Sequence, residues 1–403
     1  MKNKLLHTPE GVRDIYNGEC ERKLCLQNDL HRVLKSYGCR DIETPTFEFF
    51  DVFGSEVGTT PSRELYKFFD REGNTLVLRP DITPSIARAV SKYFAEEEKN
   101  IRLCYVGNTF INNPGYQGRL KERTHLGAEL IGSNDAQTDA ETIAMVVDCL
   151  KAAGLEEFQI SIGQVDYFKS IVSSLKIEED IAEELKDYIS NRNLFGVETI
   201  VSNIPMDEQS RRALLELPSL YGSVEVLKRA ADLACSEEAS LAVRRLWDVW
   251  HLLEYYDVTR YISFDLGMLG SYNYYTGIFF RGYTFGSGDA VVKGGRYDHL
   301  LKHFGKDAPS IGFVVEIDRL MAALSRQKIP AGELPEILTL YYTEELQKQA
   351  ITLAKKLRLE GKMVALQFVT HQQLVSEPEL LKQTEMLREL CKKYNITAGE
   401  VQP

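Results

Sequence analysis

A long charged segment of helical periodicity, from about Tyr167 to Tyr256, separates two regions of the chain in which β patterning dominates. Before it, runs rich in β-branched and aromatic residues are punctuated by proline, and after it β patterning returns from about residue 261. Strand-rich regions interrupted by helices are typical of an antiparallel sheet rather than a parallel one. The sequence therefore predicts an α+β fold: a largely antiparallel sheet flanked by helices, with a helical insertion at about 167–256.

Several elements can be placed from local signals. A helix is expected from Glu19 to Gly38, because its apolar residues recur with helical spacing and glycine suits the left-handed conformation that ends many helices. Thr83 and Pro84 are expected as the N-cap and first residue of another helix. A third helix should end near Gly154, and a half-buried strand should follow it.

The pattern restarts after Pro330 with a strand, a helix, a second strand and a second helix. We therefore expect two domains, a core at 1–325 that contains the insertion and a small C-terminal α/β domain at 331–403. This second region carries nine Lys and Arg against ten acidic residues, counted from Ala331 to Pro403.

Composition limits the partners and the compartment. The formal net charge of −11 over 403 residues gives no overall field to gather a polyanion, so nucleic acid is not an expected partner. The seven cysteines are scattered without a CxxC pair, which favours a reducing compartment. There is no run of 18 apolar residues and no N-terminal export signal. We expect a cytoplasmic protein that does not associate with membranes.

Two weaker signals concern metal and phosphate. His299 and His303 have the spacing of metal ligands on a helix, but no glutamate follows His299 and no third ligand is evident. The Gly-Gly-Arg triplet at 294–296 lacks the spacing of a phosphate loop, and we expect a tight backbone turn there. No nucleophile can be paired with a base from local sequence. We expect no metal, no cofactor and no catalytic residue.

Seven ordered blocks of the sequence carry a resemblance to a known family. Together they resemble the catalytic core of class II histidyl-tRNA synthetases, over roughly residues 8–325, with the helical insertion in the corresponding place. This resemblance implies a class II aminoacyl-tRNA synthetase-like antiparallel sheet flanked by helices. The blocks lie at 8–15, 42–48, 76–83, 126–132, 273–280, 294–300 and 312–320.

Three positions depart from the synthetase pattern. The arginine that holds the α-phosphate in that family is Ile111 here, a second arginine of the family is Gly270, and a glycine of the third motif is Glu316. A fixed donor that meets developing charge is typically worth roughly 2.7–4 kcal/mol. The resemblance therefore implies that this chain has lost adenylation activity.

The same departures are similar to those of a non-catalytic branch, the regulatory subunits of ATP phosphoribosyltransferase, which act in the first step of histidine biosynthesis. That resemblance implies a short-form catalytic subunit as partner, in a hetero-octamer, and L-histidine as a feedback effector. It also implies self-association as a dimer through the first-motif region. The alternative is an active histidyl-tRNA synthetase or a related amino-acid-activating ligase. The balanced charge of 331–403 counts against the synthetase, because an anticodon-binding domain usually offers cations.

The resemblance further implies that the amino-acid pocket is retained. Two carboxylates can hold an α-ammonium, and tyrosine hydroxyls can bond to an imidazole or its neighbours. His125 stands where the family has glutamine. The residues implied for histidine binding are Asp81, Thr83, Arg119, His125, Glu129, Tyr274 and Tyr275.

Six of these seven residues, all except His125, also have a plain structural interpretation. Asp81 and Thr83 could cap the helix that begins at Pro84. Glu129 could be a solvated strand position. Tyr274 and Tyr275 could be core aromatics, and Arg119 could be a solvated loop cation. The residues taken one by one do not exclude these alternatives; only their joint occurrence favours a pocket.

Overall fold

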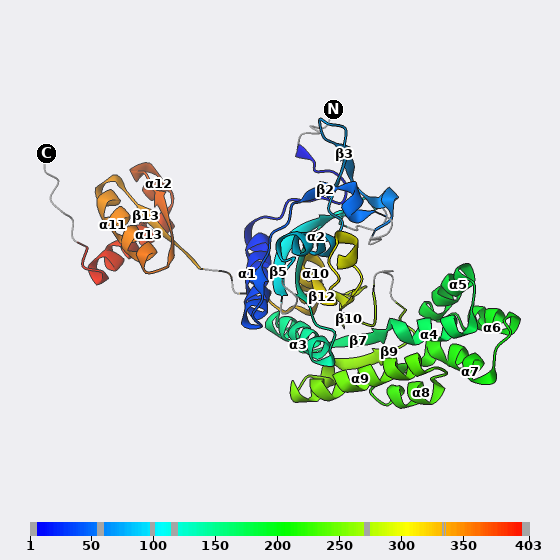
Figure 1. The fold of residues 1–403 in the computed structure, drawn as a ribbon. Coiled ribbons are helices and arrows are strands. Elements are labelled where there is room, and N and C mark those ends of the chain that lie inside the picture. Colours follow the sequence, from blue (N-terminus) through cyan, green and yellow to red (C-terminus); the bar gives the residue numbers. More distant parts are fainter. Residues whose placement is uncertain are drawn as a thin grey trace. The chain divides into compact units, whose positions relative to one another are not determined.

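The computed structural model describes residues 6–54, 60–96, 101–113, 120–269, 275–332, 334 and 336–396. The chain forms two compact units, 1–332 and 333–403. Figure 1 traces the chain through the two units, each of which is described by itself. Arg119, Gly270 and Tyr274 lie outside the described residues.

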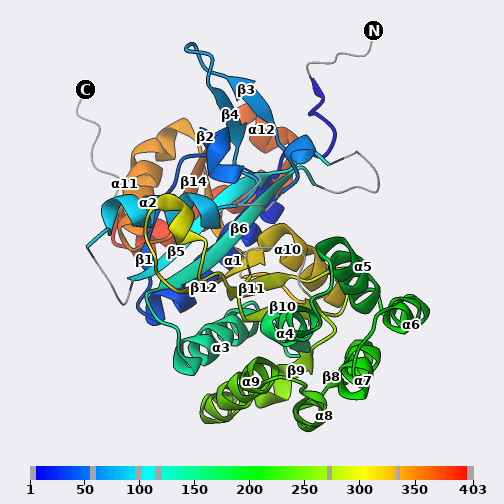
Figure 2. The ribbon, with the colours of Figure 1, turned by 45° about the vertical axis from the view of Figure 1, so that its right-hand side comes forward.

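A nine-stranded sheet forms the centre of the first unit, in the order β1-β5-β6-β12-β11-β10-β7-β9-β8. Within the described residues, β1 pairs parallel to β5 and β7 parallel to β9, while the other neighbours are antiparallel. The predicted largely antiparallel sheet is confirmed, and Figure 2 shows β5, β6 and β12 side by side. The strands are β1 (Arg40–Asp41), β5 (Ile101–Phe110), β6 (Glu122–Ile131), β7 (Phe158–Gln164), β8 (Tyr221–Gly222), β9 (Ile262–Asp265), β10 (Ile278–Thr284), β11 (Val292–Arg296) and β12 (Ser310–Glu316).

Successive side chains of a strand point to opposite faces of the sheet, so the buried side chains form two layers. On β6, Leu126, Ala128 and Leu130 enter the main core, which α1, α3 and α10 cover. On the opposite face, Ile86 of α2 packs against Tyr105 of β5 in a second cluster. The intervening residues of β6 therefore point toward the α2 side. These helices are α1 (Asn17–Ser36), α2 (Thr83–Tyr93), α3 (Ala136–Ala152) and α10 (Ile317–Gln327).

The helix ends follow the local signals with one exception. Gly38 and Gly154 have positive φ, +80° and +88°, as the predicted helix C-termini require. The predicted cap of α2 is wrong by one residue: Thr83 is already helical, and the cap position is Ile82, with no capping side chain. The hydroxyl of Thr83 is instead used in a tertiary contact, described below.

The charged segment forms the helices α4 to α9, drawn in green in Figure 1. Their buried residues, including Leu185, Leu214 and Leu246, belong to the same core as the sheet. The insertion is thus packed onto the fold rather than held away from it. Its helices are α4 (Val165–Leu175), α5 (Glu179–Ser190), α6 (Leu194–Asn203), α7 (Glu208–Glu216), α8 (Val226–Leu233) and α9 (Glu237–Tyr255).

A three-stranded sheet in the order β2-β4-β3 completes the first unit. Its strands are β2 (Phe47–Phe49), β3 (Lys67–Phe69) and β4 (Thr75–Leu78). Short 3₁₀ turns connect elements at η2 (Phe50–Phe53), η3 (Ser62–Glu64), η4 (Leu217–Ser219), η5 (Thr259–Tyr261) and η6 (Leu301–Phe304).

The second unit is a small α/β structure with its own core. Its two strands pair parallel, and Leu340, Leu353 and Leu387 are buried between them and the helices. The elements are β13 (Ile337–Tyr342), η7 (Glu344–Leu346), α11 (Gln347–Leu359), β14 (Met363–Phe368), α12 (His371–Ser376) and α13 (Pro378–Lys393). Among the helices that the structure describes in either unit, none combines the length and the apolar character needed to cross a bilayer.

Candidate functional site

A narrow cavity of about 70 Å³ lies on the α2 side of the central sheet. The register brings its walls together, because His125 pairs with Glu316 and Glu129 with Gly312 across β6 and β12. The start of α2 closes one end. Five of the seven residues implied by the family resemblance line this one cavity: Asp81, Thr83, His125, Glu129 and Tyr275. The other two, Arg119 and Tyr274, lie outside the described residues and stay predictions.

Glu129 is the most buried acidic group of the cavity, with only 1% of its surface exposed. Its carboxylate accepts hydrogen bonds from the hydroxyls of Thr83 at 2.7 Å, Tyr105 at 3.5 Å, and Tyr297. Burial raises the pKa of Glu129 to about 8, and the nearby Asp81 contributes, while the hydroxyl bonds partly offset the rise. The interpretation of Glu129 as a solvated strand residue is wrong. It is a buried carboxylate held by neutral hydroxyl groups.

Asp81 and Thr83 lie at the start of α2 and line the same cavity as Glu129. The Asp81 carboxylate accepts a hydrogen bond from the backbone N–H of Ile82 at 2.7 Å, and it also interacts with the backbone N–H of Thr83, the first residue of α2. Burial raises the pKa of Asp81 above its ordinary value, against the opposing charge of His125. The capping interpretation is wrong for Thr83, whose hydroxyl donates to Glu129, whereas Asp81 does contact backbone N–H groups at the start of α2. Two acids with raised pKa values thus line the same cavity wall.

His125 lines the cavity and has one buried ring nitrogen without a hydrogen-bond partner among the described residues. Its Nε2 lies 3.4 Å from the hydroxyl of Thr109, whereas its buried Nδ1 has no hydrogen-bond partner among the described residues. Burial lowers the pKa of His125, and the nearby Glu316 and Asp81 oppose this shift. Because a buried polar atom without a partner costs about 1–3 kcal/mol, its presence points to a ligand or water.

Tyr275 belongs to both the cavity wall and the core. Its ring stacks on Phe279 with centroids 5.8 Å apart, and it packs beside Gly295, where a Cβ would come within 2.8 Å of the ring. The interpretation of Tyr275 as a core aromatic is therefore correct as far as its packing goes. The same residue also lines the cavity.

Glu316 lies at the far end of the cavity and is surrounded by cations. Its carboxylate lies 3.2 Å from Lys293, 3.1 Å from Arg319 and 3.6 Å from Arg123. Burial opposes ionisation of Glu316, but Lys293 above all, with His125 and the arginines, outweighs it and holds the pKa below the ordinary value. The carboxylate of Glu316 therefore forms ion pairs with the cations that would otherwise attract a phosphate group.

The sequence reasoning missed several residues that build this site. Tyr105 and Tyr297 supply hydroxyls to Glu129, Lys293 supplies the nearest cation to Glu316, and Gly312 leaves room for a carboxylate. Only Gly312 had a local signal, as a glycine inside a strand-like run. The others are ordinary strand or turn residues until the register brings them together.

Two other sequence predictions change in the structure. The Gly-Gly pair, Gly294 and Gly295, lies within β11 rather than in a tight turn, and a Cβ on Gly294 would come within 2.5 Å of the Phe280 ring. Close packing explains these glycines. His299 lies in a turn and His303 in the short η6, so the expected helix that would bring them to one face is absent from this described segment.

The family model described as Histidyl-tRNA synthetase matches residues 11–320. The ATP phosphoribosyltransferase regulatory subunit of Acetivibrio thermocellus is 39% identical over 357 residues, which cover 88% of this chain and 85% of that protein. The regulatory subunit of Caldanaerobacter subterraneus is 37% identical over 360 residues, covering 89% of this chain and 94% of its own. This chain belongs to the ATP phosphoribosyltransferase regulatory subunit family.

Solved structures agree with this assignment. A crystal structure described as an ATP phosphoribosyltransferase regulatory subunit/histidyl-tRNA synthetase from Bacillus halodurans has a TM-score of 0.83 at 32% identity, covering 91% of this chain and 94% of that one. Histidyl-tRNA synthetase from a Nostoc species, at 21% identity and a TM-score of 0.77 over 94% of this chain and 89% of its own, shares the fold. As a member of the regulatory subunit family, this chain is a regulatory subunit with a synthetase-like fold and not itself the catalyst.

Proposed function

We propose that this regulatory subunit senses L-histidine in the cavity between α2, β6, β11 and β12. The α-ammonium would lie against Glu129 and Asp81, and the imidazole would lie near Tyr275 and His125. Thr83 supports the site by fixing Glu129. Arg119 and Tyr274, which lie outside the described residues, complete the proposed set.

The observation that carries this proposal is a buried carboxyl group, Glu129, beside a partly buried one, Asp81, with no cation in direct contact with either among the described residues. The groups that contact Glu129 are hydroxyls, which stabilise a negative charge but do not neutralise it. The pKa values of Glu129 and Asp81 are raised because burial of these carboxyl groups is not compensated by enough positive charge nearby. A ligand ammonium would supply the missing positive charge in the place where burial makes it most effective.

The opposite wall suits the carboxylate of an amino acid. Ile111, Arg123 and Lys293 line both the 70 Å³ cavity and a second, adjoining one of about 530 Å³. A histidine molecule oriented with its ammonium toward Glu129 would direct its carboxylate to Lys293 and Arg123. Both cations pair with Glu316 in this structure, so the ligand carboxylate would have to share them with Glu316. Typical ligand pockets measure about 300–1,000 Å³, so we expect the narrow cavity to widen toward the second on binding.

Adenylation is not supported by the same geometry. Ile111, an apolar residue, lines both cavities where the synthetases have their phosphate-binding arginine. Glu316 engages Lys293 and Arg319, so a triphosphate would meet a carboxylate instead of free cations. The comparisons favour the regulatory function over the alternative of an active synthetase or ligase.

We further propose that the protein acts in the cytoplasm, bound to a short-form ATP phosphoribosyltransferase catalytic subunit as a hetero-octamer, and that it self-associates as a dimer through the first-motif region. The names of its relatives support the catalytic partner. Histidine bound in the cavity would then lower the rate of phosphoribosyl transfer from phosphoribosyl pyrophosphate to ATP.

The deciding experiment combines this chain with the cognate catalytic subunit. Co-elution in size-exclusion chromatography, a raised rate of phosphoribosyl transfer and inhibition by histidine are expected. Elution profiles that stay separate at micromolar concentrations, with an unchanged rate, would contradict the proposed complex. Complex formation without histidine inhibition would contradict only the sensing role.

A further inference from the structure

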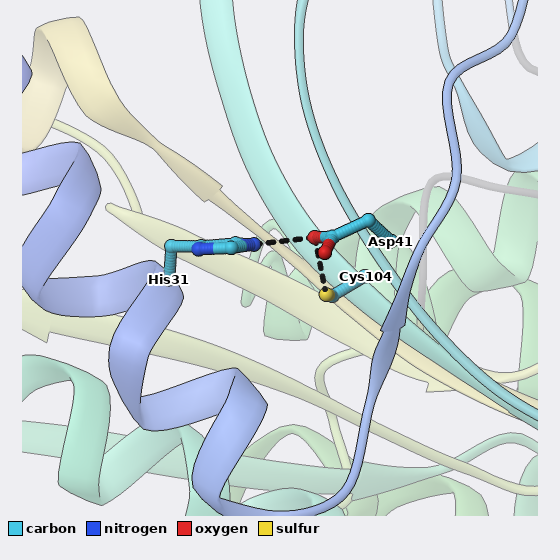
Figure 3. A group of neighbouring side chains, drawn as sticks. All are labelled: His31, Asp41 and Cys104. Atoms are coloured by element: carbon cyan, nitrogen blue, oxygen red, sulfur yellow. Dashed lines mark hydrogen bonds and ion pairs between the residues drawn. The ribbon is translucent and has the colours of Figure 1, made fainter.

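Three potential metal ligands of different chemistry meet at the edge of the central sheet, away from the cavity. Asp41 and Cys104 are register partners on the parallel strands β1 and β5, so their side chains share one face. His31 reaches them from α1, which covers that face. Figure 3 shows the three side chains pointing toward one another. The site residues described above take no part in this cluster.

The ligand atoms converge on one oxygen. His31 Nε2 lies 2.5 Å and Cys104 Sγ 3.4 Å from the same Oδ1 of Asp41. All three ligand atoms lie within 4.8 Å of one another. One nitrogen, one sulfur and one oxygen atom thus lie close together, from three different elements of the fold.

We propose that His31, Asp41 and Cys104 bind a divalent zinc-type ion. Imidazole nitrogen, thiolate sulfur and carboxylate oxygen are the ligands that zinc takes in proteins, whereas magnesium and calcium prefer oxygen alone. Three protein ligands leave a fourth position of the tetrahedron for water. The carboxylate and the thiolate together match the charge of the ion.

The surroundings permit the ion to enter and hold the ligands in place. The side chains of His31 and Asp41 are 34% and 60% exposed, so the site opens to solvent, while Cys104 is fixed in the core. The 2.5 Å contact between His31 and Asp41 must lengthen to admit an ion, which this exposure allows. Lys35 donates to the other carboxylate oxygen, Oδ2, at 2.8 Å. That bond leaves Oδ1 for the metal and orients the carboxylate from the outer shell.

Without metal, the three residues form a simple hydrogen-bonded cluster. The Cys104 Sγ donates to Asp41 Oδ1 at 3.4 Å. A zinc ion would displace the thiol proton, as metal binding to thiols does in general. The bound ion would connect α1 to the strand pair β1 and β5, and would therefore stabilise this edge of the sheet.

The test uses the full chain, freed of metal with a chelator and titrated with Co²⁺ and then Zn²⁺. One Co²⁺ per chain, a thiolate-to-cobalt absorption band displaced by Zn²⁺, and a melting temperature raised by Zn²⁺ are expected. Cys104→Ala should abolish the band. Cys149→Ala, which removes another fully buried thiol outside the cluster, should keep it.

Replacing the buried Cys104 removes a core side chain and therefore also affects the stability of the fold. Variants of the more exposed ligands His31 and Asp41 test the site without changing the core. His31→Gln and Asp41→Asn should each weaken Co²⁺ binding at least tenfold. The proposal is overturned if Co²⁺ does not bind the wild-type chain with a thiolate band. It is equally overturned if the band persists in Cys104→Ala, or if both exposed variants bind Co²⁺ as tightly as the wild type.

Discussion

The carboxylate of Glu129 occupies the space that a side chain at Gly312 would fill. The two residues are partners in the antiparallel register of β6 and β12, and a Cβ placed on Gly312 would stand 1.6 Å from Glu129 Oε2. The glycine thus allows an acidic side chain to lie flat across the centre of the sheet. The buried carboxylate depends on this one missing side chain.

Gly312→Ala is expected to destabilise the protein and to disrupt the cavity. The added methyl group overlaps Glu129, and overpacking of this kind typically costs about 1–3 kcal/mol. Urea unfolding measures the decrease in the free energy of unfolding. Gly288→Ala is the control, since a Cβ there meets no atom within 4 Å and the predicted change is within about 0.5 kcal/mol. Equal stability of the two variants would contradict the contact.

Glu129→Ala should weaken histidine binding and feedback inhibition at least tenfold. Truncating one carboxylate of a buried charged contact costs about 2–5 kcal/mol, which more than accounts for that factor. Calorimetry with the isolated chain and inhibition curves on the complex measure the two effects. Glu122→Gln, which removes a charge from the same strand outside the cavity, should bind normally. If histidine inhibits both Glu129→Ala and Tyr275→Phe as it does the wild type, the effector site lies elsewhere, most plausibly between subunits.

Glu129 also predicts a pH dependence of stability. Its pKa is raised to about 8 from an ordinary 4.5, so the folded state holds this proton more tightly than the unfolded state. The resulting stability is present at low pH and falls as pH rises toward 8, by at most about 1.4 kcal/mol per unit. Glu129→Gln does not titrate there. The free energy of unfolding of the wild type should therefore decline relative to that of Glu129→Gln between about pH 5 and 8, and parallel curves would exclude a raised pKa.

Glu316→Gln should convert the phosphate-excluding wall into an anion site. Removing this charge leaves Lys293 and Arg319 with less negative charge nearby, so pyrophosphate binding should tighten about tenfold, equivalent to about 1.4 kcal/mol. Fluorescence or calorimetric titration measures it. Glu141→Gln, which removes a carboxylate paired with Arg102 at 2.7 Å, serves as the control. An equal gain in both variants would show a general charge effect rather than a specific site.

The wild-type chain should not make histidyl adenylate. Ile111 replaces a phosphate-binding arginine and Glu316 occupies the remaining cations, so the transition state lacks its main electrostatic support. Histidine-dependent exchange between ATP and pyrophosphate is the assay. Exchange clearly above the background of a heat-inactivated sample would contradict this expectation.

Much of the architecture could be predicted from local pattern. Helical spacing and a glycine suited to positive φ predicted α1, and the alternation of apolar and polar residues predicted β7. Charged segments of helical periodicity predicted the insertion. These patterns are visible in the sequence because periodicity and backbone preference act over a few neighbouring residues. The ordered motifs identified the family and five residues that the structure brings to one cavity.

Only the tertiary structure decided what these residues do. Burial and charge depend on neighbours distant in sequence: Glu129 is not solvated because Thr83, Tyr105 and Tyr297 surround it, 46, 24 and 168 residues away. Likewise, Asp81 and Thr83 carry the local signature of a helix cap, yet the start of α2 directs the Thr83 hydroxyl to Glu129. Periodicity is a property of the local chain, whereas the protonation and partners of a buried group are set by strand register and helix packing, which bring distant residues together.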